Sequence, residues 1–322
     1  MNVLITGGAG FIGSHLVEAM LARGHAVTVV DDLSTGREEN LASVREDERL
    51  RFVRGTVRDE PLMAHLVKAC DAVFHLAAAV GVQLIADDPV HTIETNIHGT
   101  EVVLAQAAQY GRRVLIASTS EVYGKNTRTP FREDDDCTLG PTRFSRWSYA
   151  CSKMVDEFLA LAYHGQFGLP TVVCRLFNTI GPRQTGQYGM VVPRFVRWAL
   201  DGEPVQVYGD GTQSRCFCHV ADVIEALAGL IDCPQAVGQV VNVGNDESVT
   251  IDALADLVIE MTGSAGGKVH VPYADAYGRP IDDLLVRKPD LSRARDLIGY
   301  RPKRGLRQTL EEIIGWHRAH RG

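Results

Sequence analysis

The chain has 322 residues, of which 45% are hydrophobic and 23% charged, and its formal net charge is −7 at pH 7. This length provides one large or two modest domains with a buried core, and the composition is typical of a globular enzyme. The acidic balance argues against nucleic-acid binding, and no apolar run approaches the roughly 18 residues that cross a membrane.

The first 32 residues have the layout of a dinucleotide-binding βαβ unit. An apolar run at Val3–Ile5 leads into the glycine-rich motif GGAGFIG at residues 7–13. An amphipathic segment follows to about Arg23, and a second apolar run at Ala26–Val30 ends in two aspartates. Strand, glycine turn, helix, strand and acid in this order predict a nucleotide site at the start of the first helix.

Each part of this motif has a physical role. Gly7 permits a tight turn, Gly10 lets the backbone approach a pyrophosphate, and Gly13 lets the helix pack closely. The helix N-terminus offers free N–H groups and a partial positive charge to the phosphates. A carboxylate at Asp31 or Asp32 can accept from both ribose hydroxyls and repels a 2′-phosphate, so the sequence predicts NAD rather than NADP as the cofactor.

Strands and helices then alternate as far as residue 178. Short apolar runs predict strands near Phe52-Val53 and at Ala72–Leu76, Val114–Ala117 and Thr171–Leu176. Amphipathic segments predict helices at Pro61–Ala69, Pro89–Gln109 and Tyr149–Phe167. This alternation predicts an α/β fold, a Rossmann-like doubly wound parallel sheet with helices on both faces.

Beyond residue 178 frequent glycines separate shorter elements. We expect a strand at Val240–Val243 and helices at Ile251–Met261 and Leu306–His320, in a smaller α+β cap over the carboxyl edge of the sheet. The sequence therefore predicts an NAD-binding domain at 1–178 and a substrate-binding cap at 179–322, with room for the chain to cross between them. The seven cysteines are an odd, scattered set, typical of a reduced cytoplasmic protein, and no metal site is predicted.

Tyr149 and Lys153 lie four residues apart, which puts both on one face of a helix. A phenol has a pKa near 10 and is a poor base at neutral pH. We predict that the Lys153 ammonium and the positive charge of the oxidised cofactor lower the pKa of Tyr149, which then accepts a proton. The Ser118-Thr119-Ser120 cluster follows a strand, and a hydroxyl there can share the proton of a substrate hydroxyl.

A set of motifs extends along nearly the whole chain. It comprises GGAGFIGSHL from Gly7, HLAA from His75, STSEVYG from Ser118, YACSK from Tyr149, RLFNTIGPR from Arg175, YGDGTQSRCF from Tyr208, HVADV from His219 and VNVGN from Val241. In combination these motifs resemble the extended short-chain dehydrogenase/reductases that modify nucleotide sugars, the NAD-dependent epimerase/dehydratase group. One departure is Gly55-Thr56-Val57, where the family often has an aspartate in the middle position.

The resemblance implies site residues by position. Thr119, Tyr149 and Lys153 would form the catalytic trio. The residues implied to contact NAD are Gly7, Gly10, Phe11, Ile12, Gly13, Asp31, Asp32, Thr56, Val57, Leu76, Ala77, Ala78, Asn96, Ser118, Tyr149 and Lys153. Those implied to contact the nucleotide sugar are Ser120, Glu121, Asn178, Val192, Tyr208, Arg215, Arg279 and Arg287. Among these, Arg215 and Arg279 fall where the family clamps the pyrophosphate, a task that suits guanidinium groups because they pair bidentately with phosphate oxygens.

The resemblance leaves the reaction open. Members first oxidise the C4 hydroxyl; an epimerase then returns hydride to the other face, whereas a decarboxylase loses a C5 carboxylate that lies β to the new ketone. Glu121 and the Arg287-Lys288-Pro289-Asp290 segment resemble UDP-glucuronate decarboxylases, which give UDP-xylose or a UDP-4-keto-pentose. A 4,6-dehydratase needs Asp-Glu where this chain has Ser120-Glu121, so dehydration is not expected. We rank a UDP-sugar 4-epimerase first, because it is the commonest activity of the superfamily, and the decarboxylase second; a UDP-uronate 4-epimerase would reconcile both.

Two further expectations follow from the resemblance. The helices at Pro89–Gln109 and Tyr149–Phe167 form a dimer interface in relatives, which implies a homodimer. A catalytically silent NAD-binding sensor is the non-enzyme alternative, and the intact Thr119, Tyr149 and Lys153 argue against it.

Overall fold

Seven parallel strands form the central sheet of the computed structural model, which describes residues 1–81, 88–186, 190–277 and 285–320. The strand order is β11-β6-β5-β4-β1-β2-β3. The bounds are β1 (Asn2–Thr6), β2 (Ala26–Asp31), β3 (Leu50–Arg54), β4 (Ala72–His75), β5 (Arg113–Thr119), β6 (Thr171–Leu176) and β11 (Val240–Val243). The order reverses between β1 and β4, the point at which doubly wound sheets bind ligands. The predicted α/β fold is confirmed.

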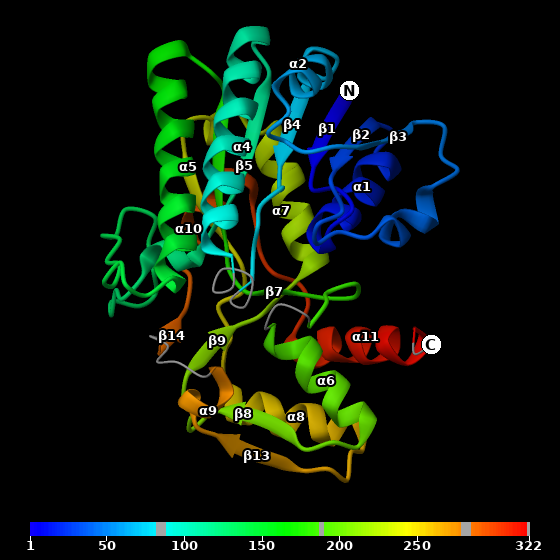
Figure 1. Cartoon of the computed structure of the whole chain (residues 1–322), viewed down its shortest axis with the longest axis vertical. Helices are drawn as coiled ribbons and strands as arrows, with labels where there is room; N and C mark the ends of the chain where they lie inside the picture. Colours follow the sequence, from blue (N-terminus) through cyan, green and yellow to red (C-terminus); the bar gives the residue numbers. More distant parts are fainter. Residues whose placement is uncertain (82–87, 187–189, 278–284, 321–322) are drawn as a thin grey trace.

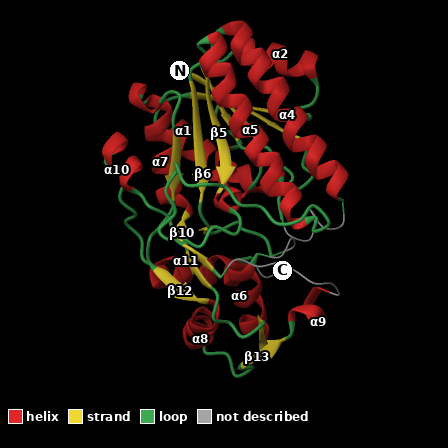
Figure 2. Ribbon diagram, turned by 90° about the vertical axis from the view of Figure 1, so that its left-hand side faces the viewer, coloured by secondary structure: helices red, strands yellow, loops and turns green. Residues whose placement is uncertain are grey.

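Helices cover both faces of this sheet (Figure 2). One face carries α1 (Phe11–Ala22), α7 (Val220–Asp232), α10 (Ser292–Ile298) and the 3-10 helices η1 (Glu38–Val44) and η3 (Pro234–Ala236). The other face carries α2 (Glu60–Lys68), α4 (Pro89–Tyr110) and α5 (Arg146–Phe167). Successive residues of β1 enter different cores, Val3 and Ile5 beneath α1 and Leu4 beneath α2 and α4. Burial on both faces explains why the strands are apolar throughout.

A smaller region lies below the carboxyl ends of the strands (Figure 1). Its helices are α6 (Val191–Asp201), α8 (Ile251–Thr262), α9 (Tyr273–Tyr277) and α11 (Leu306–Ala319). Its strand pairs are β8 (Val205–Tyr208) with β13 (Lys268–Val271), and β9 (Ser214–Cys216) with both β12 (Ser248–Thr250) and β14 (Val286–Arg287). The pair β7 (Thr179–Ile180) and β10 (Cys218–His219) lies between this region and the sheet. A separate apolar core fills it, with Phe195 of α6, Leu254 of α8 and Ile313 of α11.

The chain crosses between the two regions more than once. Strand β11 pairs with β6, and α7 packs on the sheet, although both follow residue 178 in sequence. The division into 1–178 and 179–322 therefore stays a proposal, and the sheet takes its last strand from beyond it. No helix in the described ranges combines the length and apolar character that a membrane crossing requires.

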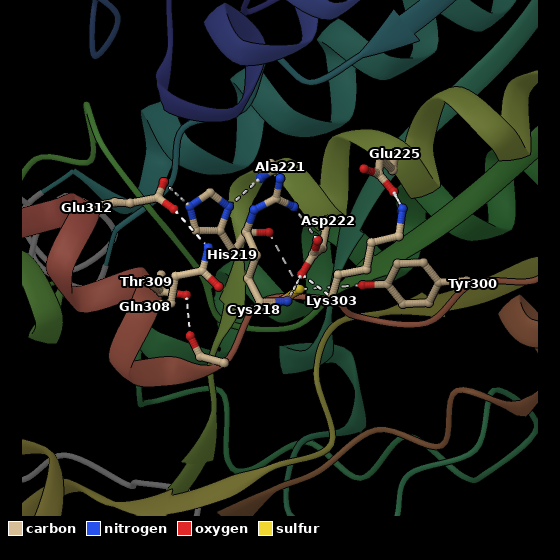
Figure 3. A network of polar contacts seen from close by, with 12 residues as sticks. Cys218, His219, Ala221, Asp222, Glu225, Tyr300, Lys303, Gln308, Thr309 and Glu312 are labelled. Carbon is tan, nitrogen blue, oxygen red and sulfur yellow. Dashed lines mark hydrogen bonds and ion pairs between the residues drawn. The ribbon is translucent and has the colours of Figure 1, made fainter.

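Polar contacts attach the C-terminal helix to α7 (Figure 3). The His219 imidazole lies 2.9 Å from the Glu312 carboxylate of α11, and its other ring nitrogen accepts from the Ala221 N–H. The buried Asp222 carboxylate accepts from the N–H groups of Lys303 and Arg304 and from the Arg304 guanidinium. These bonds fix the segment that connects the sheet region to α11.

Candidate active site

A cavity of about 530 Å³ lies along the carboxyl ends of the strands and extends into the smaller region. It brings together most of the residues that the sequence analysis singled out. The lining includes Gly7, Gly10, Phe11, Ile12, Gly13, Asp31, Asp32, Thr56, Val57, Leu76, Ala77, Ala78, Ser118, Thr119, Ser120, Glu121, Tyr149, Asn178, Val192, Tyr208, Arg215 and Arg287. Asn96 and Lys153 are not part of it, and Arg279 lies outside the described residues.

The glycine turn has the close packing that the motif predicts. Gly7 has a φ of +70°, a left-handed conformation that favours glycine, and a Cβ there would lie 2.8 Å from the Ala77 nitrogen. A Cβ on Gly13 would lie only 2.1 Å from the Gly7 oxygen. Helix α1 then begins at Phe11 with no side-chain cap on its first N–H groups, and the residues of its first turn line the cavity. This cradle fits the diphosphate of a dinucleotide.

The two aspartates after β2 have different surroundings. Asp31 is 7% exposed and accepts from the N–H groups of Ala9 and Leu33, both at 2.9 Å. Burial raises the pKa of Asp31, and these backbone hydrogen bonds oppose the rise. Asp32 is exposed and accepts from the Ser34 N–H. Asp31 thus ties the glycine turn to the end of β2, and both carboxylates line the cavity.

Thr119 and Tyr149 meet at the centre of the cavity wall. Thr119 ends β5 and accepts from the Glu121 N–H at 3.2 Å, while Tyr149 projects from the first turn of α5. Burial raises the pKa of Tyr149, with the negative charges of Glu121 and Asp156 adding to the rise. A hydrogen bond with Thr119 and the positive charge of Arg287 oppose it. The side chain is therefore a neutral phenol among these groups.

Lys153 is paired with a carboxylate behind the cavity wall. Its Nζ donates to Asp156 Oδ2 at 2.7 Å, and both side chains are almost fully buried behind the cavity wall. The carboxylate offsets the ammonium charge that was expected to act on Tyr149. Among the described groups, burial and two carboxylates raise the pKa of Tyr149. The predicted lowering also depends on the positive charge of the oxidised cofactor and stays a prediction.

Asn96 also differs from its expected place. Its amide oxygen accepts from the Ala79 N–H at 2.8 Å, and its nitrogen donates to Ser152 Oγ at 3.1 Å. The side chain is buried between α4, α5 and the loop after β4. Asn96 thus supports the cavity wall from behind.

The sugar end of the cavity contains an arginine opposite a glutamate. Arg287 Nη1 lies 3.3 Å from Glu121 Oε1, and both side chains are largely buried. Strand β14 pairs with β9, which sets Arg287 beside Arg215. The loop between Tyr123 and α5 holds the segment that follows Arg287, since the Phe131 N–H donates to the Lys288 oxygen at 2.8 Å.

Two buried N–H donors on this wall have no hydrogen-bond partner in the described structure. They are Arg287 Nε and Asn178 Nδ2. An unsatisfied buried donor is costly, and the explanation is often a ligand acceptor. Both atoms therefore indicate where an oxygen-rich ligand fits.

Sequence reasoning missed several residues that line the cavity. They are Arg146, Arg183, Arg194, Gln206, Gln213 and Tyr273. Arg183 ends the RLFNTIGPR motif, which could have identified it. Its φ of +70° is unusual for a side chain with a Cβ, and its guanidinium donates to Ser14 and Glu18 of α1. The remaining residues lie on elements whose approach to the site depends on the tertiary fold.

A buried polar network supports the catalytic loop from below. Ser118 Oγ donates to the Glu157 carboxylate of α5, which also pairs bidentately with the Arg175 guanidinium of β6 through its two oxygens. Arg175 in turn lies over the Tyr123 ring and donates to the Glu133 oxygen. Every charge in this network is paired, as burial requires.

Comparisons with known proteins agree with this geometry. Residues 3–244 match the model of the NAD dependent epimerase/dehydratase family. The UDP-N-acetyl-alpha-D-glucosaminuronate decarboxylase of Bacillus cytotoxicus is 41% identical over 98% of this chain and 97% of its own length. UDP-glucuronic acid decarboxylase 1 of Arabidopsis thaliana is 36% identical over 98% of this chain and 69% of its own length.

One solved structure has the same fold along nearly the whole chain. The UDP-glucose 4-epimerase of Thermus thermophilus in complex with NAD has a TM-score of 0.86 and 31% identity, over 99% of this chain and 100% of that one. The cofactor is therefore NAD, and the glycine cradle described above has the shape to hold it. The chain belongs to the NAD-dependent epimerase/dehydratase family of extended short-chain dehydrogenase/reductases.

Proposed function

We propose that this protein is a UDP-uronate decarboxylase, with UDP-N-acetylglucosaminuronate and UDP-glucuronate as the first substrates to test. The observation that carries the proposal is Arg287, which faces Glu121 across 3.3 Å and has a buried Nε without a partner in the described structure. A uronate carboxylate is an acceptor that satisfies this donor. The Bacillus cytotoxicus and Arabidopsis thaliana relatives named above are decarboxylases of such sugars, which supports the same reaction.

The side chains have separable tasks in this reaction. Tyr149 accepts the proton of the C4 hydroxyl, and Thr119, hydrogen-bonded to Tyr149, orients that hydroxyl. Bound NAD supplies the hydride acceptor for the oxidation at C4. Tyr149 accepts this proton as the phenolate, which the positive charge of the oxidised cofactor and the Lys153 ammonium one helical turn away would favour against the groups that raise its pKa.

Arg287 and Glu121 act at the other end of the sugar. Arg287 orients the uronate carboxylate, and the Glu121 carboxylate beside it disfavours a second negative charge at the same place. Once C4 is a ketone, the C5–C6 bond breaks, carbon dioxide leaves, and the electron pair passes to the enolate of the ketone. C5 then takes up a proton. Return to C4 of the hydride that the cofactor would hold restores the C4 hydroxyl, so the reaction has no net oxidation and the product differs from the uronate by one carbon dioxide. Departure of the carboxylate removes the charge repulsion with Glu121.

The sequence analysis ranked the 4-epimerase first, and the relatives favour its alternative. The epimerase keeps support from the solved structures, since the Thermus thermophilus enzyme superposes along the whole chain. The same Thr119 and Tyr149 would serve both reactions, and the difference lies in whether a carboxylate leaves C5. The UDP-sugar class of substrate is common to both proposals.

Mass spectrometry with NMR on the products tests the proposal. The purified protein is incubated separately with UDP-N-acetylglucosaminuronate, UDP-glucuronate and UDP-glucose. A product lighter by one carbon dioxide from a uronate supports the decarboxylase and identifies its substrate. An unchanged mass with inverted configuration at C4 establishes the epimerase instead. The Tyr149→Phe variant serves as the inactive control.

The same family relation supports a homodimer formed by α4 and α5. These helices pack side by side on one face of the sheet (Figure 1). Val90 and Ile93 of α4 and Phe158 of α5 are exposed. Phe158 is 68% exposed, and a partner that covers these apolar side chains would remove them from water.

Light scattering after size-exclusion chromatography tests the homodimer. The unmodified chain is expected to elute at twice its mass, and Phe158→Glu at the mass of one chain, because a buried unpaired charge opposes association. A monomer in both cases would contradict the proposal.

A cytoplasmic location also stays a prediction.

A further inference from the structure

A buried ion pair stands directly behind the catalytic wall. Lys153 Nζ lies 2.7 Å from Asp156 Oδ2, and the two residues are 2% and 0% exposed. Asp156 does not line the cavity, and the function proposed above gives it no task. Burying a carboxylate is costly unless it is paired, so its place next to the catalytic lysine needs a reason.

Polar side chains lie between this pair and the cofactor side of the cavity. Thr100 of α4 influences the Asp156 carboxylate, whose buried Oδ1 has no hydrogen-bond partner in the described structure, and Thr100 Oγ1 lies 3.1 Å from His75 Nε2 of β4. His75 Nδ1 lies 2.8 Å from Thr6 Oγ1 of β1. The Thr6 hydroxyl also accepts from the N–H groups of the two residues after His75, Leu76 and Ala77, which line the cavity.

This chain of contacts fixes Asp156 from several elements at once. Burial lowers the pKa of His75 to about 3, so its imidazole is neutral and gives one donor and one acceptor to the two threonines. The charged groups around Asp156 are therefore Lys153 and Glu157 of the same helix. Around Tyr149 they are Glu121 after β5, Arg287 of β14, and the Lys153–Asp156 pair.

We propose that Asp156 is a positioning residue for Lys153, and that its carboxylate sets how much positive charge reaches Tyr149. The inference rests on the proposed role of Tyr149 as the proton acceptor. A charge-assisted bond of 2.7 Å fixes the ammonium on the inner face of α5 and offsets its charge. Asp156 thereby keeps Tyr149 protonated at a higher pH than Lys153 alone would allow.

The electrostatics of Tyr149 agree with the geometry. After burial and Glu121, the Asp156 charge is the next cause that raises the pKa of Tyr149. Replacing the carboxylate by a neutral amide of the same shape removes that charge and leaves the ammonium uncompensated. The change in Tyr149 then has a definite sign, towards ionisation at lower pH.

Titration of the tyrosinate absorbance tests this inference without any substrate. The signal of the NAD-loaded protein is recorded against pH, and the signal of the matching Tyr149→Phe background is subtracted. In Asp156→Asn we expect the Tyr149 midpoint to fall by about one pH unit, a size typical of removing one nearby charge. With an active substrate, the acid limb of kcat/KM moves by the same amount and in the same direction.

Thr100→Val provides the matched control. It perturbs the same buried network without changing its charge, so the midpoint of Tyr149 is expected to stay in place. Equal shifts in both variants, or an unshifted midpoint in Asp156→Asn with normal bound NAD, would overturn the inference. If the asparagine variant does not fold, Asp156→Ala removes the same charge and has to give the same downward shift.

The two proposals fail in different ways. Absence of carbon dioxide loss from every uronate rejects the decarboxylase but leaves the tyrosinate titration unchanged. A normal decarboxylase with an unshifted midpoint rejects the role of Asp156 alone.

Discussion

The cofactor side and the sugar side of the cavity are built in different ways. The cofactor side comes from consecutive segments, the turn after β1, the end of β2 and the loops after β3, β4 and β5. The sugar side combines Glu121 and Asn178 with Arg215 and Arg287, which come from distant parts of the sequence. The cofactor side is thus a property of one parallel sheet, whereas the sugar side depends on how the smaller region packs against that sheet.

The cofactor side therefore serves dinucleotide binding in general, and the sugar side determines which substrate is accepted. Backbone N–H groups and missing Cβ atoms form the cofactor side, and they suit any dinucleotide of the right charge. Side chains with paired or unsatisfied groups form the sugar side, where one charge can select a substrate. Substitutions can show where one side ends and the other begins.

The largest effect is expected where the two sides meet, at Tyr149→Phe. The variant keeps the buried ring but loses the group that accepts the C4 proton. Turnover should fall about 10³-fold, within the range typical of lost general-base catalysis, with NAD content unchanged. Steady-state kinetics and the absorbance of released NAD measure both. Near-normal turnover would remove Tyr149 as the base.

The next effect concerns the sugar side alone. Arg287→Gln leaves Glu121 without its partner and removes the positive charge opposite the uronate. Affinity for UDP-glucuronate should fall about 10²-fold, the value of a charge-assisted hydrogen bond, while affinity for neutral UDP-glucose changes far less. Calorimetric titration measures both affinities. Equal losses for both sugars would mean that Arg287 does not recognise a carboxylate.

A stability effect is expected on the cofactor side, at His75. Burial lowers its pKa to about 3, below the ordinary value of about 6.5, so between these values the unfolded chain binds more protons. Its contribution to the free energy of unfolding is present above the unfolded pKa and is lost as the pH falls. Between about pH 7 and pH 5 the free energy of unfolding of the unmodified protein should fall by about 2 kcal/mol more than that of His75→Gln.

Urea unfolding at the two pH values measures this difference. The exposed His98 of α4 offers a matched control, since His98→Gln should follow the pH dependence of the unmodified protein. If the curves of His75→Gln and the unmodified protein stay parallel with pH, His75 does not carry the effect.

The smallest effect is expected at the attachment of α11 (Figure 3). Glu312→Gln weakens a contact with His219 at 2.9 Å, but the Glu312 side chain is 41% exposed. The free energy of unfolding should fall by less than about 1 kcal/mol, as for surface ion pairs, with catalysis unchanged. Asp222→Ala leaves three donors of the same network without their buried acceptor. In the same urea experiment it should lower the free energy of unfolding by more than Glu312→Gln does.

The sequence determined the parts of the protein that depend on short segments. The glycine turn, the aspartates after β2 and the Tyr149–Lys153 spacing follow local rules of backbone geometry and helical periodicity, so they could be predicted residue by residue. Apolar runs separated by amphipathic helices fixed the doubly wound sheet for the same reason.

The tertiary structure decided how distant charges meet. Asp156 is three residues from Lys153, so their adjacency on the helix is local, but only the packing of α4 on α5 buries the pair behind the catalytic wall, where the Asp156 charge raises the pKa of Tyr149. It also brings Arg287 from β14 to within 3.3 Å of Glu121. Burial and charge act through space, so the chemistry of these side chains depends on neighbours that no local pattern in the sequence specifies.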